Sequence, residues 1–224
     1  MLNSKTSVKL AALPFFALSL LAQPVTTPSS EPQERRLGHT VEGTRPFTQA
    51  VFHTLLAAGV PGGIISARSC KPEASVAFRA TGEMTLGDAL THIATITGGG
   101  AHWTVADGVI NVALQADRPR FLDVPIARLS FTDTTNLWLS LDHLIQSAEA
   151  RKYLEDTKLN YRLPRSIWAT DKPKTPPRPV EIRNMTISKV LNMLAADNGK
   201  AIWIYHENSC PNSPNTLDLR IVGE

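Results

Sequence analysis

Motifs for catalysis and metal binding are missing from this chain of 224 residues. Its six histidines show no ligand spacing such as HxxxH or HExxH, so no metal site is predicted. There is no GxSxG nucleophile motif, and the glycine run 98–100 follows a predicted helix and lacks a phosphate-binding lysine. Asp142 and His143 are adjacent on a predicted helix, where neighbouring side chains point in different directions. We therefore predict no catalytic residue, no cofactor and a non-enzymatic role, with an exported hydrolase as an alternative.

A large excess of charge is also missing. The formal net charge is +3, and Lys5 and Lys9 lie in a leading segment that has no acidic residue. Without these two lysines the chain has 21 basic and 20 acidic residues, so its charge gives no support to a nucleic-acid partner. Hydrophobic residues make up 42% of the chain and charged residues 19%, which is typical of a folded globular protein.

Long hydrophobic runs are limited to the beginning of the chain. Leu10–Leu21 is apolar but interrupted by Pro14, and it is shorter than the roughly 20 residues that span a bilayer. Two lysines precede this run and the small Ala22 follows it, a pattern typical of a secretory signal peptide over residues 1–22. No cysteine follows the run, so we expect no lipid anchor and membrane association only through a partner. We expect export to the periplasm, with an extracellular location as the alternative.

The two cysteines, Cys70 and Cys210, are compatible with an oxidising compartment. Each lies in a predicted loop, in opposite halves of the chain. A bridge between them would close a loop of about 140 residues and stabilise the fold by roughly 4–5 kcal/mol in the chain-entropy model. We predict this disulfide, with two free thiols as the alternative.

What the chain does contain is an internal repeat. The stretch MTLGDALTHIATITGGGAHW begins at Met84, and MTISKVLNMLAADNGKAIW begins at Met185. Aligned positions include Ala89/Leu90 with Val190/Leu191, Gly98 with Gly199 and Trp103 with Trp203. Each stretch has a helical apolar period and is followed by alternating residues, which predicts a helix followed by two strands.

The predicted fold class is α+β, with duplicated β-α-β-β units whose helices pack on small mixed sheets. Residues 23–44 are polar and rich in Pro, Ser and Thr, so a flexible tether is expected there. Two related halves follow at 45–114 and 119–224. Predicted helices begin at Pro46, Thr85, Asp133 or Thr134, and Thr186, and the third continues to about Leu154. Predicted strands cover 64–67, 75–79, 101–105, 109–113, 121–126, 180–183, 201–205 and 217–222. Asp107-Gly108 is predicted to form a type I′ hairpin turn, and strand 201–205, which is apolar on both faces, is predicted to be central.

Several prolines break this pattern over 155–179, where we expect an irregular excursion. The wider stretch Arg151–Arg178 is basic, and its aromatic residues include Tyr161 and Trp168. Its eight cations are candidates for binding an anionic envelope ligand: Arg151, Lys152, Lys158, Arg162, Arg165, Lys172, Lys174 and Arg178. The simpler interpretation, which we favour, is a solvated excursion whose aromatic residues pack back onto the domain.

Residues 47–113 contain the segments AAGVPGGIIS, TLGDALTHIATITG and HWTVADGVINV, and residues 180–222 match one unit of this arrangement again. Together they resemble the N-terminal short domain of secretins and TonB-dependent receptors, a small periplasmic α+β module built from two β-α-β units. Family members precede an outer-membrane secretin or receptor, whereas no barrel follows here. The resemblance implies a free-standing periplasmic module that binds a protein partner, often through an exposed strand edge. We therefore expect an adaptor for a secretion or outer-membrane transport or signalling component; the sequence leaves its oligomeric state open.

Overall fold

The computed structural model describes residues 31–68, 73, 75–114, 119–162 and 179–223. The described residues form five α-helices and three separate sheets, so the predicted α+β class is confirmed. The helices are α1 (Phe47–Ala58), α2 (Leu86–Ile96), α3 (Leu137–Ile145), α4 (Ala148–Thr157) and α5 (Ile187–Asn198). The strands are β1 (Val41–Pro46), β2 (Gly62–Arg68), β3 (Ser75–Ala80), β4 (His102–Ala106), β5 (Val109–Ala113), β6 (Pro125–Phe131), β7 (Asn160–Arg162), β8 (Val180–Thr186), β9 (Ile202–Asn208) and β10 (Thr216–Val222). None of the described helices has the length and apolar character needed to cross a membrane.

Both halves of the chain contribute to one six-stranded sheet, of order β4-β5-β2-β9-β10-β7. The first three strands come from the first half and the last three from the second half. The halves meet where β2 and β9 pair in parallel, from Gly62 opposite Ile202 to Arg68 opposite Asn208. Two small antiparallel sheets, β1-β3 and β6-β8, lie outside this sheet.

The duplication extends further than the repeated segments show. Each half has the order β-α-β-β-α-β-β, with α4 added after α3 in the second half. In each half the first and third strands pair antiparallel, the second and last pair parallel, and the last two form an antiparallel hairpin. The first helices of the two halves show little sequence similarity, which is why the repeat was found only over its second part.

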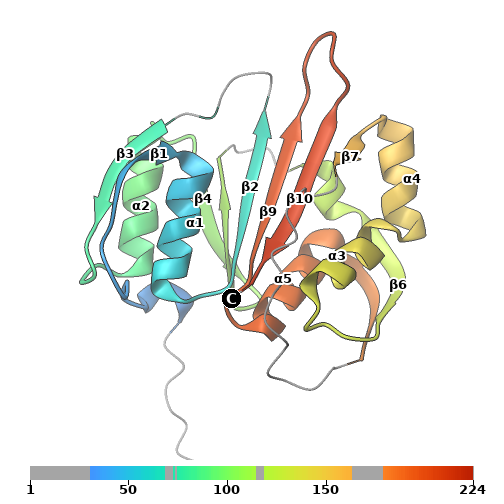
Figure 1. Ribbon diagram of the computed structural model, residues 1–224, viewed down its shortest axis with the longest axis horizontal. Coiled ribbons are helices and arrows are strands. Elements are labelled where there is room, and N and C mark those ends of the chain that lie inside the picture. The colour runs from blue at the N-terminus through green and yellow to red at the C-terminus, as the bar shows by residue number, and fades with distance from the viewer. Residues whose placement is uncertain (1–30, 69–72, 74, 115–118, 163–178, 224) are drawn as a thin grey trace, which may run out of the picture.

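The two halves place their helices on opposite faces of the shared sheet. Side chains alternate along β9: Ile202 and Ile204 pack into the core beneath α1 and α2, whereas Trp203 and Tyr205 pack into the core beneath α3 and α5. Accordingly, α1 and α2 lie to the left of β2 in Figure 1, and α3 and α4 lie to the right of β10. All four β9 side chains from 202 to 205 are buried, as predicted for a central strand.

Trp203 of β9 packs directly on the backbone of the neighbouring strand. Gly63 lies opposite Trp203 in the β2–β9 register. A Cβ atom at Gly63 would lie 2.2 Å from Cζ2 of Trp203, so only glycine fits there. The indole N–H donates to Oδ1 of Asn192 on α5 at 2.9 Å, which satisfies the one polar atom of a fully buried ring. The packing of Trp203 on Gly63 fixes the position of the second half relative to the first.

Local signals account for the helix ends that the sequence predicted. The Thr85 hydroxyl accepts a hydrogen bond from the backbone N–H of Asp88 and caps α2, as expected. The Thr186 hydroxyl accepts in the same way from the backbone N–H of Lys189 and caps α5. Gly59 and Gly199 end α1 and α5 in the left-handed conformation. Asp107 and Gly108 both have positive φ, as the predicted type I′ turn requires.

Four predicted elements were wrong. The flexible tether was placed over residues 23–44, but its last four residues begin β1, whose Val41 is buried. The strand predicted at 121–126 is a 3-10 helix over Arg120–Asp123, and only its last two residues belong to β6. The long helix predicted from Asp133 or Thr134 to about Leu154 is divided into α3 and α4, since Asn136 and Ser147 each cap a new helix. The excursion predicted over 155–179 includes the end of α4 and β7.

We predict that Gly63→Ala destabilises the protein by about 3 kcal/mol, the upper end of typical overpacking effects. The added methyl group would overlap the indole of Trp203, which is held between β2 and α5. Gly100→Ala is the matched control, because its Cβ would meet only carbonyl oxygens at 3.5 and 3.6 Å. The midpoint of urea unfolding measures both changes. Equal midpoints for the two variants would contradict the packing described here.

Candidate functional site

The outer edge of β4 is the first candidate site. Within the described part of the chain β4 pairs with β5 alone, so its other edge has no strand beside it. Four of its five residues are exposed, and Trp103 is half-buried. The strand contains no proline and no charged residue, the two devices that often protect an edge from further pairing. Its backbone is therefore open to an additional strand.

Trp103 of β4 is the structural equivalent of Trp203 of β9. The Nε1–H of Trp103 donates to the Thr91 hydroxyl at 3.2 Å, as Trp203 donates to Asn192. Thr91 and Asn192 are each the sixth residue of their helix. Both indoles thus take the same orientation relative to their own half. The difference is the neighbour: β2 covers Trp203, and no described strand covers Trp103.

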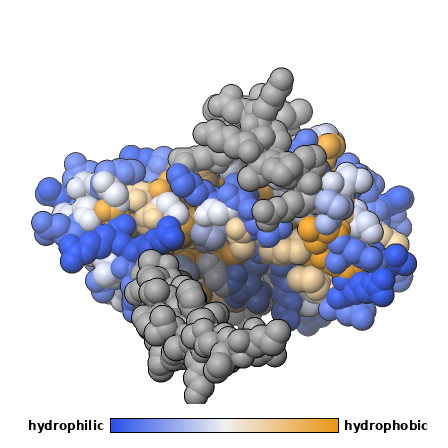
Figure 2. Space-filling model, turned by 90° about the horizontal axis from the view of Figure 1, so that it is seen from below, coloured by the Kyte–Doolittle hydropathy of each residue, from blue (hydrophilic) through white to orange (hydrophobic). Residues whose placement is uncertain are grey.

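The exposed apolar residues around this edge are few. Val105 of β4 is 41% exposed and lies on the same face as Trp103, two residues away. Other large exposed apolar side chains are Ile96, and Trp138 and Leu139 on α3. Seen from the end of the molecule at which β2 begins, hydrophobic residues lie in separate groups among hydrophilic ones (Figure 2). The edge of β4 therefore combines a free backbone with a modest apolar contact.

The predicted anion-binding cations are partly neutralised by their neighbours. Arg151 and Lys152 lie on α4, 3.8 Å and 2.8 Å from the carboxylates of Glu155 and Asp156. The hydrogen bond to Asp156 and its charge raise the pKa of Lys152. Two more of the cations are described: Lys158 follows α4 and Arg162 ends β7. The remaining four lie outside the described residues: Arg165, Lys172, Lys174 and Arg178. Anion binding by this segment stays a prediction.

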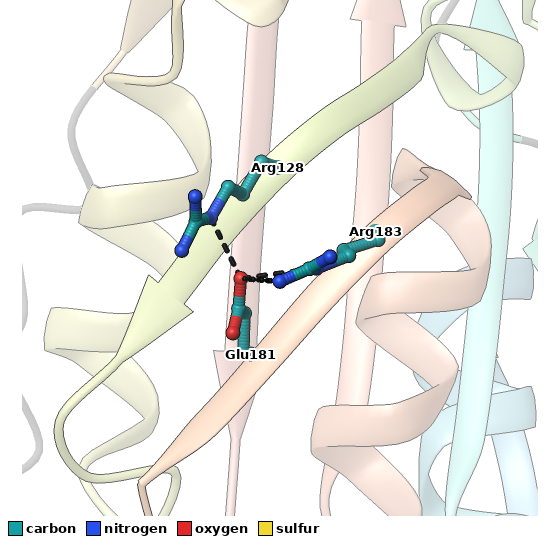
Figure 3. A network of polar contacts seen from close by, with 3 residues as sticks. All are labelled: Arg128, Glu181 and Arg183. Atoms are coloured by element: carbon teal, nitrogen blue, oxygen red, sulfur yellow. Dashed lines mark hydrogen bonds and ion pairs between the residues drawn. The ribbon is translucent and has the colours of Figure 1, made fainter.

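An exposed cluster that the sequence did not predict lies on the β6–β8 ladder. Oε1 of Glu181 is 2.6 Å from Nε of Arg128 and 3.0 Å from a terminal nitrogen of Arg183 (Figure 3). Both arginine side chains are about two-thirds exposed, at 68% and 66%. Ion pairs of such exposed side chains contribute little to stability.

Among the described residues, Thr48, Glu73 and His206 form a polar cluster with the composition of a catalytic group. The backbone N–H of Thr48 donates to the Glu73 carboxylate at 3.2 Å, and its hydroxyl donates to the same oxygen. Glu73 thereby caps the N-terminus of α1. The hydroxyl also lies 3.2 Å from Nε2 of His206. Since the hydroxyl proton is directed to Glu73, His206 does not accept it, as activation of a nucleophile would require.

The two histidines on strands of the shared sheet, His102 and His206, do not come together. Their strands, β4 and β9, are separated by β5 and β2. Alternation from Trp103 and Ile204 also directs the two side chains to opposite faces. Among the described residues no group of three His, Cys, Asp or Glu side chains is placed to hold a metal ion.

The predicted cysteine pair is only partly visible, because Cys70 lies outside the described residues. Cys210 is half-buried in the turn after β9. The parallel register places Arg68 opposite Asn208, and each cysteine follows its strand by two residues. Continuing that register by two residues would bring Cys70 opposite Cys210, so the described strands support the pairing without showing it.

No model of a protein family matches the chain, and no curated protein matches it.

We predict that Tyr161 and Tyr205 do not ionise at the usual tyrosine pH of about 10 while the protein is folded. Burial raises the pKa of Tyr161 to about 12, and it raises the pKa of Tyr153 and of Tyr205, whose hydroxyl also donates to Glu207. A raised tyrosine pKa favours the protonated folded state, so stability is full below about pH 10 and falls as pH rises towards the folded pKa. Ultraviolet absorbance of tyrosinate should rise together with unfolding. A gradual rise centred near pH 10 in the folded protein would contradict this.

We predict that Cys70 and Cys210 form a disulfide in the exported protein. The bridge would fasten the ends of β2 and β9 and add roughly 4–5 kcal/mol to stability. Peptide mapping without reductant should recover the two cysteines in one cross-linked peptide. The Cys70→Ser/Cys210→Ser variant should unfold at lower urea and lose its response to reductant. Recovery of two alkylated thiols from the untreated protein would contradict the pairing.

Proposed function

We propose that this chain is an exported, non-enzymatic envelope protein that binds another protein through the open edge of β4. Its partner would be a component of a secretion system or of outer-membrane transport or signalling. The observation that carries the proposal is the difference between two equivalent tryptophans. Trp103 is half-buried on the edge strand β4, whereas Trp203 is fully buried where β9 pairs with β2.

Strand addition suits this edge physically. An added strand gains main-chain hydrogen bonds, and side chains at alternate positions provide the specificity. The exposed residues His102, Thr104 and Val105 leave the β4 backbone accessible. The arrangement of Thr48, Glu73 and His206, which caps a helix, also favours a binding role over hydrolysis.

The resemblance to the short domain of secretins and TonB-dependent receptors supports the same proposal. Each half has a compact β-α-β-β-α-β-β order, compatible with two such modules fused through β2 and β9. The predicted signal peptide agrees with a partner in the periplasm.

We predict that a photoreactive residue at Thr104 captures one dominant envelope protein when the full chain is expressed in its native cells. Thr104 is exposed on β4, so a bound strand would lie within reach. The control position is Lys189, which is exposed on α5. Mass spectrometry should identify a partner from position 104 that is missing from position 189.

The same proteins captured from both positions, or none from position 104, would contradict the proposal. If no protein is captured and the chain instead leaves the envelope fraction as salt is raised, the basic segment 151–178 becomes the binding element.

A further inference from the structure

We infer that the edge of β4 accepts an extended segment that runs parallel to β4 and carries glycine opposite Trp103. This inference deepens the proposed function and rests on it, because it names the kind of segment that the partner presents. It derives from the duplication, which supplies a template for the missing strand inside the same molecule.

The template is the pairing of β2 with β9. In that register Gly62 and Gly63 lie opposite Ile202 and Trp203, and Ile65 lies opposite Tyr205. The indole of Trp203 extends over the β2 backbone, so that a Cβ at Gly63 would be 2.2 Å from the ring. A strand can pass beside this tryptophan only if it has glycine at that position.

The same condition applies to β4. Trp103 has the same strand position and the same hydrogen bond to its helix as Trp203, so an added strand in the β2 register would meet its ring as β2 meets the ring of Trp203. An incoming strand in the β2 register would place its glycine opposite Trp103. Two residues later it would place a side chain opposite the exposed Val105, where β2 has Ile65. The expected ligand pattern is therefore Gly-Gly followed by two aliphatic residues.

The described strands of a second copy of this chain do not offer such a segment. Its own β2 is already paired on both edges, with β5 and β9. The strand that corresponds to β2 in the second half is β7, which ends at Arg162 opposite Asp218. Strand β7 pairs with β10 as β2 pairs with β5, so the position equivalent to Gly63 lies two residues after Arg162, at Pro164. Pro164 lies outside the described residues, and proline has no backbone N–H to donate. A different protein is the occupant that fits.

The test uses a synthetic peptide with the sequence of residues 61–68, PGGIISAR, and the full exported chain. We expect this peptide to bind, and a peptide with the Gly63→Val change to bind at least about tenfold more weakly. Fluorescence anisotropy of the labelled peptides gives both affinities. A photoreactive group at the peptide N-terminus should label the protein near His102, and one at the C-terminus should label it near Ala106, as parallel pairing requires.

A double-mutant cycle assigns the glycine preference to Trp103. Trp103→Ala should remove the difference between the two peptides, whereas Trp138→Ala, an exposed tryptophan on α3, should keep it. Trp103→Phe serves if the alanine variant unfolds, and it should reduce the difference while circular dichroism confirms the fold. Equal binding of both peptides by the unmodified protein, no binding, or a preference that survives Trp103→Ala would overturn the inference.

These outcomes are separable from those of the cross-linking experiment. Capture of a partner at position 104 without glycine selectivity would leave the adaptor proposal standing and overturn the strand register argued here. Absence of capture at position 104 would overturn the adaptor proposal itself, whatever the peptides do.

Discussion

The packing of Trp203 on Gly63 is the contact on which the arrangement of the two halves depends. A parallel strand pair buried on both faces needs apolar side chains on each side and close approach of the backbones. Here β9 supplies the apolar side chains, and because Gly63 has no Cβ, the indole of Trp203 can lie over the backbone of β2. Because Asn192 holds the indole N–H from α5, the second half's helix layer is positioned by the same contact.

Because of the way β2 pairs with β9, the duplicated strand edge has a partner strand in one half and none among the described strands in the other. The halves repeat in the same left-to-right order along the sheet, with their strand directions and helix faces reversed. Such an arrangement is heterologous: the surface that β9 gives to β2 has no reciprocal partner within the pair. One copy of that surface is therefore used inside the molecule, and the second copy, at β4, lies at the end of the sheet.

Local signals in the sequence predicted those parts of the fold that local physics decides. The threonine caps of α2 and α5, the Asp107-Gly108 turn and the buried register of β9 all follow from nearest neighbours. The pairing of β2 with β9 joins residues about 140 positions apart, and no local pattern encodes it. The division of α3 from α4 was missed because Ser147 can occupy a helix interior as well as a cap. The different surroundings of Trp103 and Trp203 were missed for a related reason: the repeat alignment pairs the two residues, but it does not show that β2 lies beside Trp203 while no described strand lies on the outer side of β4.

The composition of β4 is what turns an open edge into a binding hypothesis. Natural sheets usually protect their edges with lysine, proline or a bulge, because an unprotected strand pairs with other chains. The opposite end of this sheet is short, with three residues in β7, and is followed by a proline-rich sequence. By contrast, β4 carries His-Trp-Thr-Val-Ala, without charge or proline, and keeps a tryptophan whose hydrogen bond maintains the orientation seen in the covered copy. An unprotected edge beside an indole held in this orientation is what the proposed strand addition requires.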